Sequence, residues 1–178
     1  MNQVELNKQA KLSEHFSLGE LTRSKSHPEV YNIPSHVHIE NLKRVCVWLE
    51  ALRERYNRRY VLAGAGGQVP KVEVFGENFI SRPDPEEEPI IITSGYRSAE
   101  LNRKVGGVAT SNHLTGCAVD IRVAGKEQLI RYACILLDYA DETKQEFDEL
   151  LLEHGANGVI WLHFAVRPQG NRRKIGFL

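Results

Sequence analysis

The sequence lacks several features that would place it in a specialised class of protein. Its only cysteines, Cys46, Cys117 and Cys134, are widely scattered, so they indicate no disulfide framework. The 23 Lys and Arg residues balance the 23 Asp and Glu residues, and a chain without net charge is a poor candidate for nucleic-acid binding. No apolar run is long enough to span a bilayer, and no apolar segment near the N-terminus indicates a secretory signal. We therefore expect a chain that is soluble and cytoplasmic as synthesised.

The length and hydrophobic content of the chain predict one compact domain over residues 1–178. Hydrophobic residues make up 42% of the 178 residues, which is enough to bury a core. The sequence has no internal repeats. Between about residues 64 and 89 it is rich in glycine, then in proline and acidic residues, and we interpret this stretch as a surface excursion. No feature of the sequence indicates an oligomeric state.

Hydrophobic periodicity predicts helices in the first part of the chain and strands in the second. A long helix opens at Pro34 and Ser35, with an apolar stripe that runs to Tyr56. Another helix is expected over residues 126–140, and its inner side is expected to carry Leu129, Ile130, Ala133, Cys134, Leu136 and Leu137. Strands are expected over residues 90–94 and 118–123, and residues 147–153 and 159–166 form a predicted hairpin. This order favours an α+β fold, with a small antiparallel sheet flanked by helices.

Shorter signals are present near both ends of the chain. Ser17 followed by Glu20 is typical of a capping box, which predicts a short first element. Near the C-terminus, the basic residues Arg172, Arg173 and Lys174 are interpreted as a solvated tail.

Three residues are candidate metal ligands. Asp120 and His163 each lie inside an apolar strand, where an ionisable side chain needs a partner because burying it alone costs several kcal/mol. The two can partner each other without any metal. His113 lies in a loop and is separated from Asp120 by only six residues, among them Gly116, so the loop can bring both side chains to one point. Together the three residues offer two nitrogens and one oxygen, and they leave a fourth tetrahedral position for water, as catalytic zinc requires.

Four segments, SGYRS, LNRKVGG, SNHLTGCAVDI and WLH, occur in this order and resemble a known enzyme family. They are similar to the D-alanyl-D-alanine carboxypeptidases and L-alanyl-D-glutamate peptidases, which share their fold with the N-terminal domain of Hedgehog. HFSLGELTRS resembles the opening segment of phage and prophage members. The resemblance implies a zinc ion held by His113, Asp120 and His163, and an arginine, Arg97, that polarises the scissile carbonyl. It also implies a peptidoglycan peptide as substrate.

One departure from the family concerns the general base. Well-known members carry an acidic residue three positions before the last histidine, and here that position holds Ile160, which cannot move a proton. The preceding strand offers three acidic substitutes, Asp148, Glu149 and Glu153.

The register of the hairpin decides which of these substitutes lies near His163. With Gly155 opposite Val159, both glutamates share the face of His163; with His154 opposite Val159, the aspartate does. We favour Glu153 as the base, because it is nearest the hairpin turn and would lie diagonal to His163.

These observations lead to one functional expectation and one alternative. The expected function is a zinc metallopeptidase that hydrolyses amide bonds in peptidoglycan stem peptides and acts at the cell wall after release. The alternative is a non-catalytic, zinc-bearing module that binds cell-wall peptides or a protein partner, because a fold does not fix an activity.

Overall fold

The computed structural model describes residues 6–61 and 87–178. Its helices are α1 (His36–Tyr56), α2 (Ala99–Lys104) and α3 (Lys126–Thr143), with a π-helical turn η1 (Asn57–Val61) and a 3-10 turn η2 (Asn112–Thr115). Its strands are β1 (Ile92–Ser94), β2 (Ala118–Arg122), β3 (Glu149–His154), β4 (Ile160–Ala165) and β5 (Lys174–Phe177). The predicted α+β class is confirmed.

The five strands form one sheet in the order β1-β2-β4-β3-β5. All neighbouring pairs are antiparallel except β3 and β5, which run parallel. Strand β4 therefore lies at the centre of the sheet, between β2 and β3. In the hairpin Glu153 lies opposite Trp161 and Leu151 lies opposite His163, which is the first of the two registers considered from the sequence.

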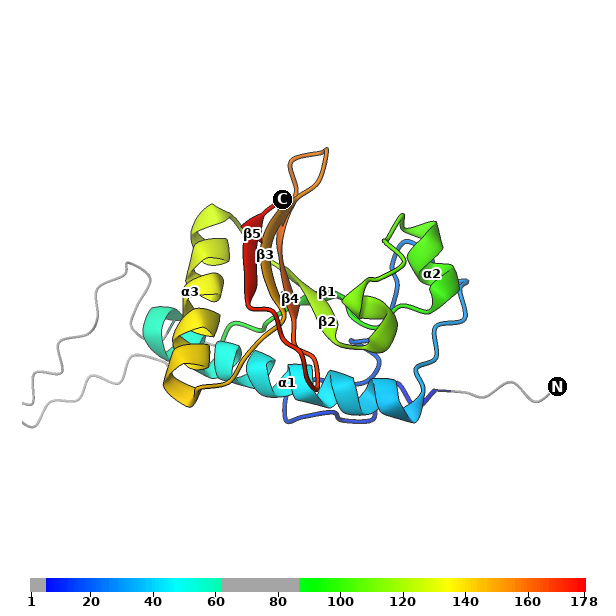
Figure 1. Ribbon diagram of the computed structural model, residues 1–178, viewed down its shortest axis with the longest axis horizontal. Helices are drawn as coiled ribbons and strands as arrows, with labels where there is room; N and C mark the ends of the chain where they lie inside the picture. Colours follow the sequence, from blue (N-terminus) through cyan, green and yellow to red (C-terminus); the bar gives the residue numbers. More distant parts are fainter. Residues whose placement is uncertain (1–5, 62–86) are drawn as a thin grey trace, which may run out of the picture.

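The two faces of the sheet have different environments. Side chains of one face, such as Ile121, Leu150 and Phe164, belong to the same buried apolar core as the inner sides of α1 and α3. Figure 1 shows α3 beside the sheet, α1 beneath it, and α2 on the side away from α3. The other face carries a row of opposed residues across the strands: Ser94, Asp120, His163, Leu151 and Gly176. The alternation of side chains along each strand thus separates a core face from a face that holds polar groups.

An aromatic cluster joins the helices to the core face of the sheet. The ring of Trp48, which is buried on α1, lies 4.9 Å from that of Tyr139 on α3 and 5.2 Å from that of Phe164 on β4. Phe147 packs at the edge of the same ring, with a centroid distance of 6.3 Å. These large side chains hold α1 and α3 against the sheet.

Helix α1 agrees with the sequence pattern, whereas α3 departs from it in part. Ser35 is the N-cap of α1 and forms a reciprocal capping pair with His38. In α3, Leu129, Ala133 and Leu136 are buried as expected, but two residues expected on the inner side, Ile130 and Cys134, are exposed. The buried side of α3 also includes Tyr132, Ile135 and Ala140, and it packs against both α1 and the sheet.

Both short terminal signals need correction. Ser17 and Glu20 form the expected reciprocal hydrogen bonds, but the segment makes a series of turns and no helix. The basic residues near the C-terminus do not form a solvated tail, since Lys174 begins β5 and Arg172 bonds to the buried Asp148. The predicted excursion at about 64–89 lies almost wholly outside the described residues. Among the described helices, none combines the length and apolarity needed to cross a membrane.

Candidate metal centre

Three side chains from separate elements meet on the polar face of the sheet. His113 lies on η2, Asp120 on β2 and His163 on β4, and the last two are direct cross-strand partners. One ligand atom from each residue lies within 4.8 Å of the other two, and all three residues are buried. The structure therefore brings together the three ligands expected from the sequence.

The local sequence around His113 explains its position. Ser111 caps η2 by accepting from the backbone N–H of His113, and Gly116 ends the turn in the left-handed region with φ of 71°. A Cβ at Gly116 would lie 2.6 Å from the carbonyl oxygen of His38, so glycine is needed both for the backbone conformation and for the close approach to α1. The turn then leads directly into β2 and Asp120.

In each histidine, one ring nitrogen faces away from Asp120 and contacts another protein group. These contacts fix which ring nitrogen faces Asp120. Nδ1 of His113 lies 2.7 Å from the carbonyl oxygen of Gly95, which can only accept, so this nitrogen carries the proton. Nε2 of His163 lies 3.4 Å from the Glu149 carboxylate, which favours a proton there as well. The opposite nitrogens face Oδ1 of Asp120, at 3.2 Å from Nε2 of His113 and 2.9 Å from Nδ1 of His163, and in neutral rings they would offer their lone pairs to a cation at this point.

Three electron-pair donors that converge in this way fit a cation. Two imidazole nitrogens and one carboxylate oxygen form a donor set suited to zinc, and the far nitrogens are held by a carbonyl and a carboxylate, as is usual for histidines that bind metals. The charges of the same groups also shift their pKa values. Burial alone would lower the pKa of His163, but Asp120 and Glu149 outweigh it and raise the pKa to about 9. Burial would raise the pKa of Asp120, yet the two histidines hold it well below its usual range.

Arg97 lies beside the three donors. It follows β1 on a turn, where its Nε donates to Ser94 at 2.8 Å and one Nη donates to Oδ2 of Asp120 at 2.6 Å. This ion pair turns the other oxygen of Asp120 towards the histidines. The second Nη has no hydrogen bond within the described part of the chain, and the guanidinium lines the same cavity as the donors.

The donors lie in an open groove with a volume of about 890 Å³. Residues 23–26 line one wall of the groove. The polar face of the sheet and residues 167–174 line the other wall, and the 105–112 segment also lines the groove. A volume in this range is typical of sites that bind small ligands.

The three acidic residues considered for proton transfer have different surroundings. Glu149 lies next to His163, accepts from Asn112 at 2.9 Å and forms an ion pair with Arg172 at 2.9 Å. Glu153 lines the groove on the same face and has no ion pair in the described structure. Asp148, which directly precedes β3, is fully buried and forms ion pairs with Arg167 and Arg172.

Sequence reasoning did not single out two groups near the centre. Glu149 was only one of several candidate bases, because both it and Glu153 are diagonal to His163 in the observed register. Asn112 precedes His113 and donates to both Asp148 and Glu149, so it links the two carboxylates. Its place beside a candidate ligand was the only sequence signal for this role.

Residues 84–143 match the model of the peptidase M15 family. The match supports a place among the M15 zinc peptidases, and with it a hydrolase. The matched segment includes Arg97, His113 and Asp120, whereas His163 lies outside it and joins them only through the pairing of β2 with β4. A search of curated proteins found no match to the chain.

Proposed function

We propose that this protein is a zinc-dependent metallopeptidase that hydrolyses amide bonds in peptidoglycan stem peptides. The reaction would be of the D,D-carboxypeptidase or the L-alanyl-D-glutamate endopeptidase type. The observation that carries this proposal is the convergence of His113, Asp120 and His163 on one point in an open groove. The match to M15 peptidases over residues 84–143 supports the same reaction class.

Each proposed role follows from the position of a side chain. The two histidines and Asp120 would hold zinc, which supplies Lewis acidity and makes water more acidic. Arg97 would stabilise the negative charge that develops on the substrate carbonyl oxygen, because one of its Nη groups is free of protein partners in the described structure. Its bond to Asp120 would keep that guanidinium in place during the reaction.

Glu153 remains our proposed general base. Glu149 is closer to His163, but its carboxylate already accepts from Asn112 and forms ion pairs with a histidine, an arginine and Lys174. A carboxylate held by so many donors is poorly suited to take up a proton. Glu153 has no such partners among the described residues, so it can take a proton from the attacking water and return it to the leaving amine.

One observation favours a second candidate function. Ile160 occupies the position that is acidic in well-known members of the family, and its side chain cannot transfer a proton. If Glu153 does not replace it, the same groove would serve a non-catalytic, zinc-bearing module that binds cell-wall peptides or a protein partner. We further propose that the site of action is the cell wall after release, in line with the resemblance to phage-type peptidases.

The test combines metal analysis with digestion of peptidoglycan. Purified protein should contain about one zinc per chain, and His113→Ala should lose most of it, whereas His154→Ala at the hairpin end should keep it. Peptidoglycan treated with the protein should release peptide fragments, identified by mass, and a chelator should abolish their release. Zinc-loaded protein that releases none would favour the binding module, and protein that takes up no zinc would exclude both functions.

A further inference from the structure

The groove is positively charged, although the chain as a whole is neutral. Three carboxylates line it, those of Asp120, Glu149 and Glu153, against six cationic side chains: Arg23, Lys25, Arg97, Arg167, Arg172 and Lys174. A bound zinc ion would add to this excess. Grooves lined by one sign of charge concentrate ligands of the opposite sign.

Most of these cations are already paired with protein carboxylates. Arg97 binds Asp120 at 2.6 Å, and Lys174 lies 3.5 Å from Glu149. Arg167 and Arg172, on the wall formed by residues 167–174, bind Asp148 at 3.0 and 2.7 Å. Because these charges are largely neutralised by ion pairs within the protein, they contribute little to binding a further anion.

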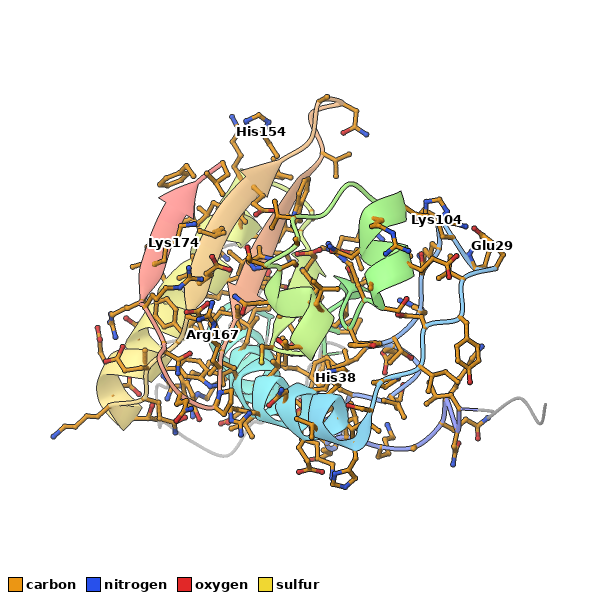
Figure 2. All side chains as sticks on the ribbon, turned by 45° about the vertical axis from the view of Figure 1, so that its right-hand side comes forward. Glu29, His38, Lys104, His154, Arg167 and Lys174 are labelled. Atoms are coloured by element: carbon orange, nitrogen blue, oxygen red, sulfur yellow. The ribbon has the colours of Figure 1, made fainter. Side chains whose placement is uncertain are left out.

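Arg23 and Lys25, on the opposite wall, differ from these cations in their ion pairing. The only side-chain hydrogen bond of Arg23 is to the carbonyl oxygen of Ile92, at 3.3 Å, and Lys25 has no ion pair within the described residues. The acidic residue of the same segment, Glu29, is bound by Lys104 at 2.9 Å; Figure 2 shows these two side chains together on the side of the molecule away from Arg167 and Lys174. Among residues 6–61 and 87–178, therefore, neither exposed cation of this wall has a carboxylate partner.

The segment that carries these two cations is fixed to the turn that carries Arg97. The backbone N–H of Tyr96 donates to the carbonyl oxygen of Leu21 at 2.8 Å. Asn32 donates to the carbonyl oxygens of Thr22 and Tyr96 and accepts from the N–H of Ser98. Because these bonds hold the segment before any ligand arrives, little order has to be gained on binding.

We propose that Arg23 and Lys25 form a subsite that binds a free carboxylate of the substrate peptide, on the Arg97 side of the scissile amide. The hydroxyl groups of Ser24 and Ser26 line the same part of the groove and can add hydrogen bonds. The inference rests on the proposed function, since the anions that a peptide offers are carboxylates. Such a group can be the C-terminal carboxylate of the substrate or a side-chain carboxylate.

The experiment compares matched peptides on three proteins. The peptides carry either a C-terminal carboxylate or a C-terminal amide, and either a side-chain carboxylate or its amide. The proteins are wild type, the double variant Arg23→Gln/Lys25→Gln, and a control, Lys43→Gln/Arg58→Gln, which removes two exposed cations of α1 and η1 that do not line the groove.

The double variant should raise KM about tenfold or more for the peptide whose carboxylate is recognised, with kcat within about twofold, because it removes binding that does not change in the transition state. Turnover of the matching amide peptide should stay the same, and the control should behave as wild type. The peptide pair that shows the difference identifies the carboxylate. Equal losses on charged and amidated peptides, or no loss on either, would overturn the subsite.

Failure of the proposed function would be separate from failure of the subsite. If wild type hydrolyses none of the peptides, binding of the same peptides with a fluorescent label is measured by anisotropy on the zinc-loaded proteins. A preference for the carboxylate peptide that the double variant loses would support the subsite without catalysis. A wild type that binds charged and amidated peptides equally would exclude it.

Discussion

The two candidate histidine ligands differ in what holds the ring nitrogen that faces away from the centre. His113 donates to a neutral carbonyl, that of Gly95, whereas His163 faces the carboxylate of Glu149. A carboxylate partner raises the basicity of an imidazole more than a carbonyl does, and such partners commonly affect metal affinity by about 10–100-fold. The two glutamates of β3 should therefore affect different properties of the protein.

Glu149→Gln should weaken zinc binding by about 10–100-fold, because it removes the charge behind His163. Glu153→Gln keeps the shape of the side chain, so it should bind zinc as wild type does and lose about 10²–10⁴ in rate. Zinc affinity is measured by competition with a chelating dye, and the rate is measured at saturating zinc. A variant at Glu149 that keeps its zinc affinity but loses the rate would assign the base to Glu149.

At the scale of elements, the turn between β1 and α2 is held on two sides. The α-carbon of Gly95 faces the backbone of Leu21, and a Cβ there would lie 2.3 Å from the Leu21 carbonyl oxygen. The carbonyl oxygen of the same glycine accepts from His113. One residue thus connects the N-terminal segment with the candidate metal centre.

Gly95→Ala should destabilise the protein by about 1–3 kcal/mol, as is usual when atoms are added to a packed site. It should also weaken zinc binding, because the carbonyl that holds His113 must move. The comparison is Gly125→Ala, where an added Cβ meets no atom within 4 Å. Denaturant unfolding and zinc titration measure both effects, and a Gly95→Ala variant as stable as the control would contradict this account of the turn.

Much of the element pattern could be predicted from local sequence, and the exceptions depend on distant contacts. The apolar stripe of α1 and the alternation in the hairpin are local signals, and both elements are found where expected. The strand Lys174–Phe177 was not predicted, because it pairs in parallel with a strand some 25 residues earlier in the chain. The basic residues at its start were interpreted as part of a solvated tail. For the site, the spacing of His113 and Asp120 was informative. The register places Glu149 and Glu153 at equivalent diagonal positions from His163, so the choice between them depends on their side-chain contacts, which the sequence does not show.

At the scale of the whole molecule, Asp148 joins segments that are far apart in the chain. Its buried carboxylate accepts from Asn112 of η2 and from Arg172, and it forms an ion pair with Arg167; both arginines lie in the loop between β4 and β5. Burial would raise the pKa of Asp148, but Arg172 and Asn112 outweigh it and hold the pKa below its usual range. A carboxylate with a lowered pKa stabilises the fold at pH values above its unfolded pKa, and this contribution is lost as the pH falls.

Asp148→Asn should therefore lower the free energy of unfolding at pH 7, by about 3 kcal/mol, because it leaves two arginines without their shared anion. The difference from wild type should shrink as the pH falls below about 4, because the carboxyl of the unfolded wild-type chain then takes up a proton that the folded state does not yet bind. Chemical unfolding from pH 7 to pH 3 measures it, and Asp138→Asn on the exposed side of α3 is the control. A difference that stays constant over this range would show that the charge of Asp148 is not what stabilises the fold.

The two tryptophans give the protein two optical reporters in different environments. Trp48 is enclosed by the aromatic cluster between α1, α3 and β4, so its emission should lie at short wavelength and shift to the red only when the core unfolds. Trp161 lines the groove opposite Glu153, so its emission should respond to a peptide that enters while the core stays folded. Replacing either indole with phenylalanine would leave a single emitter, and ligand entry and unfolding could then be followed separately in the same cuvette.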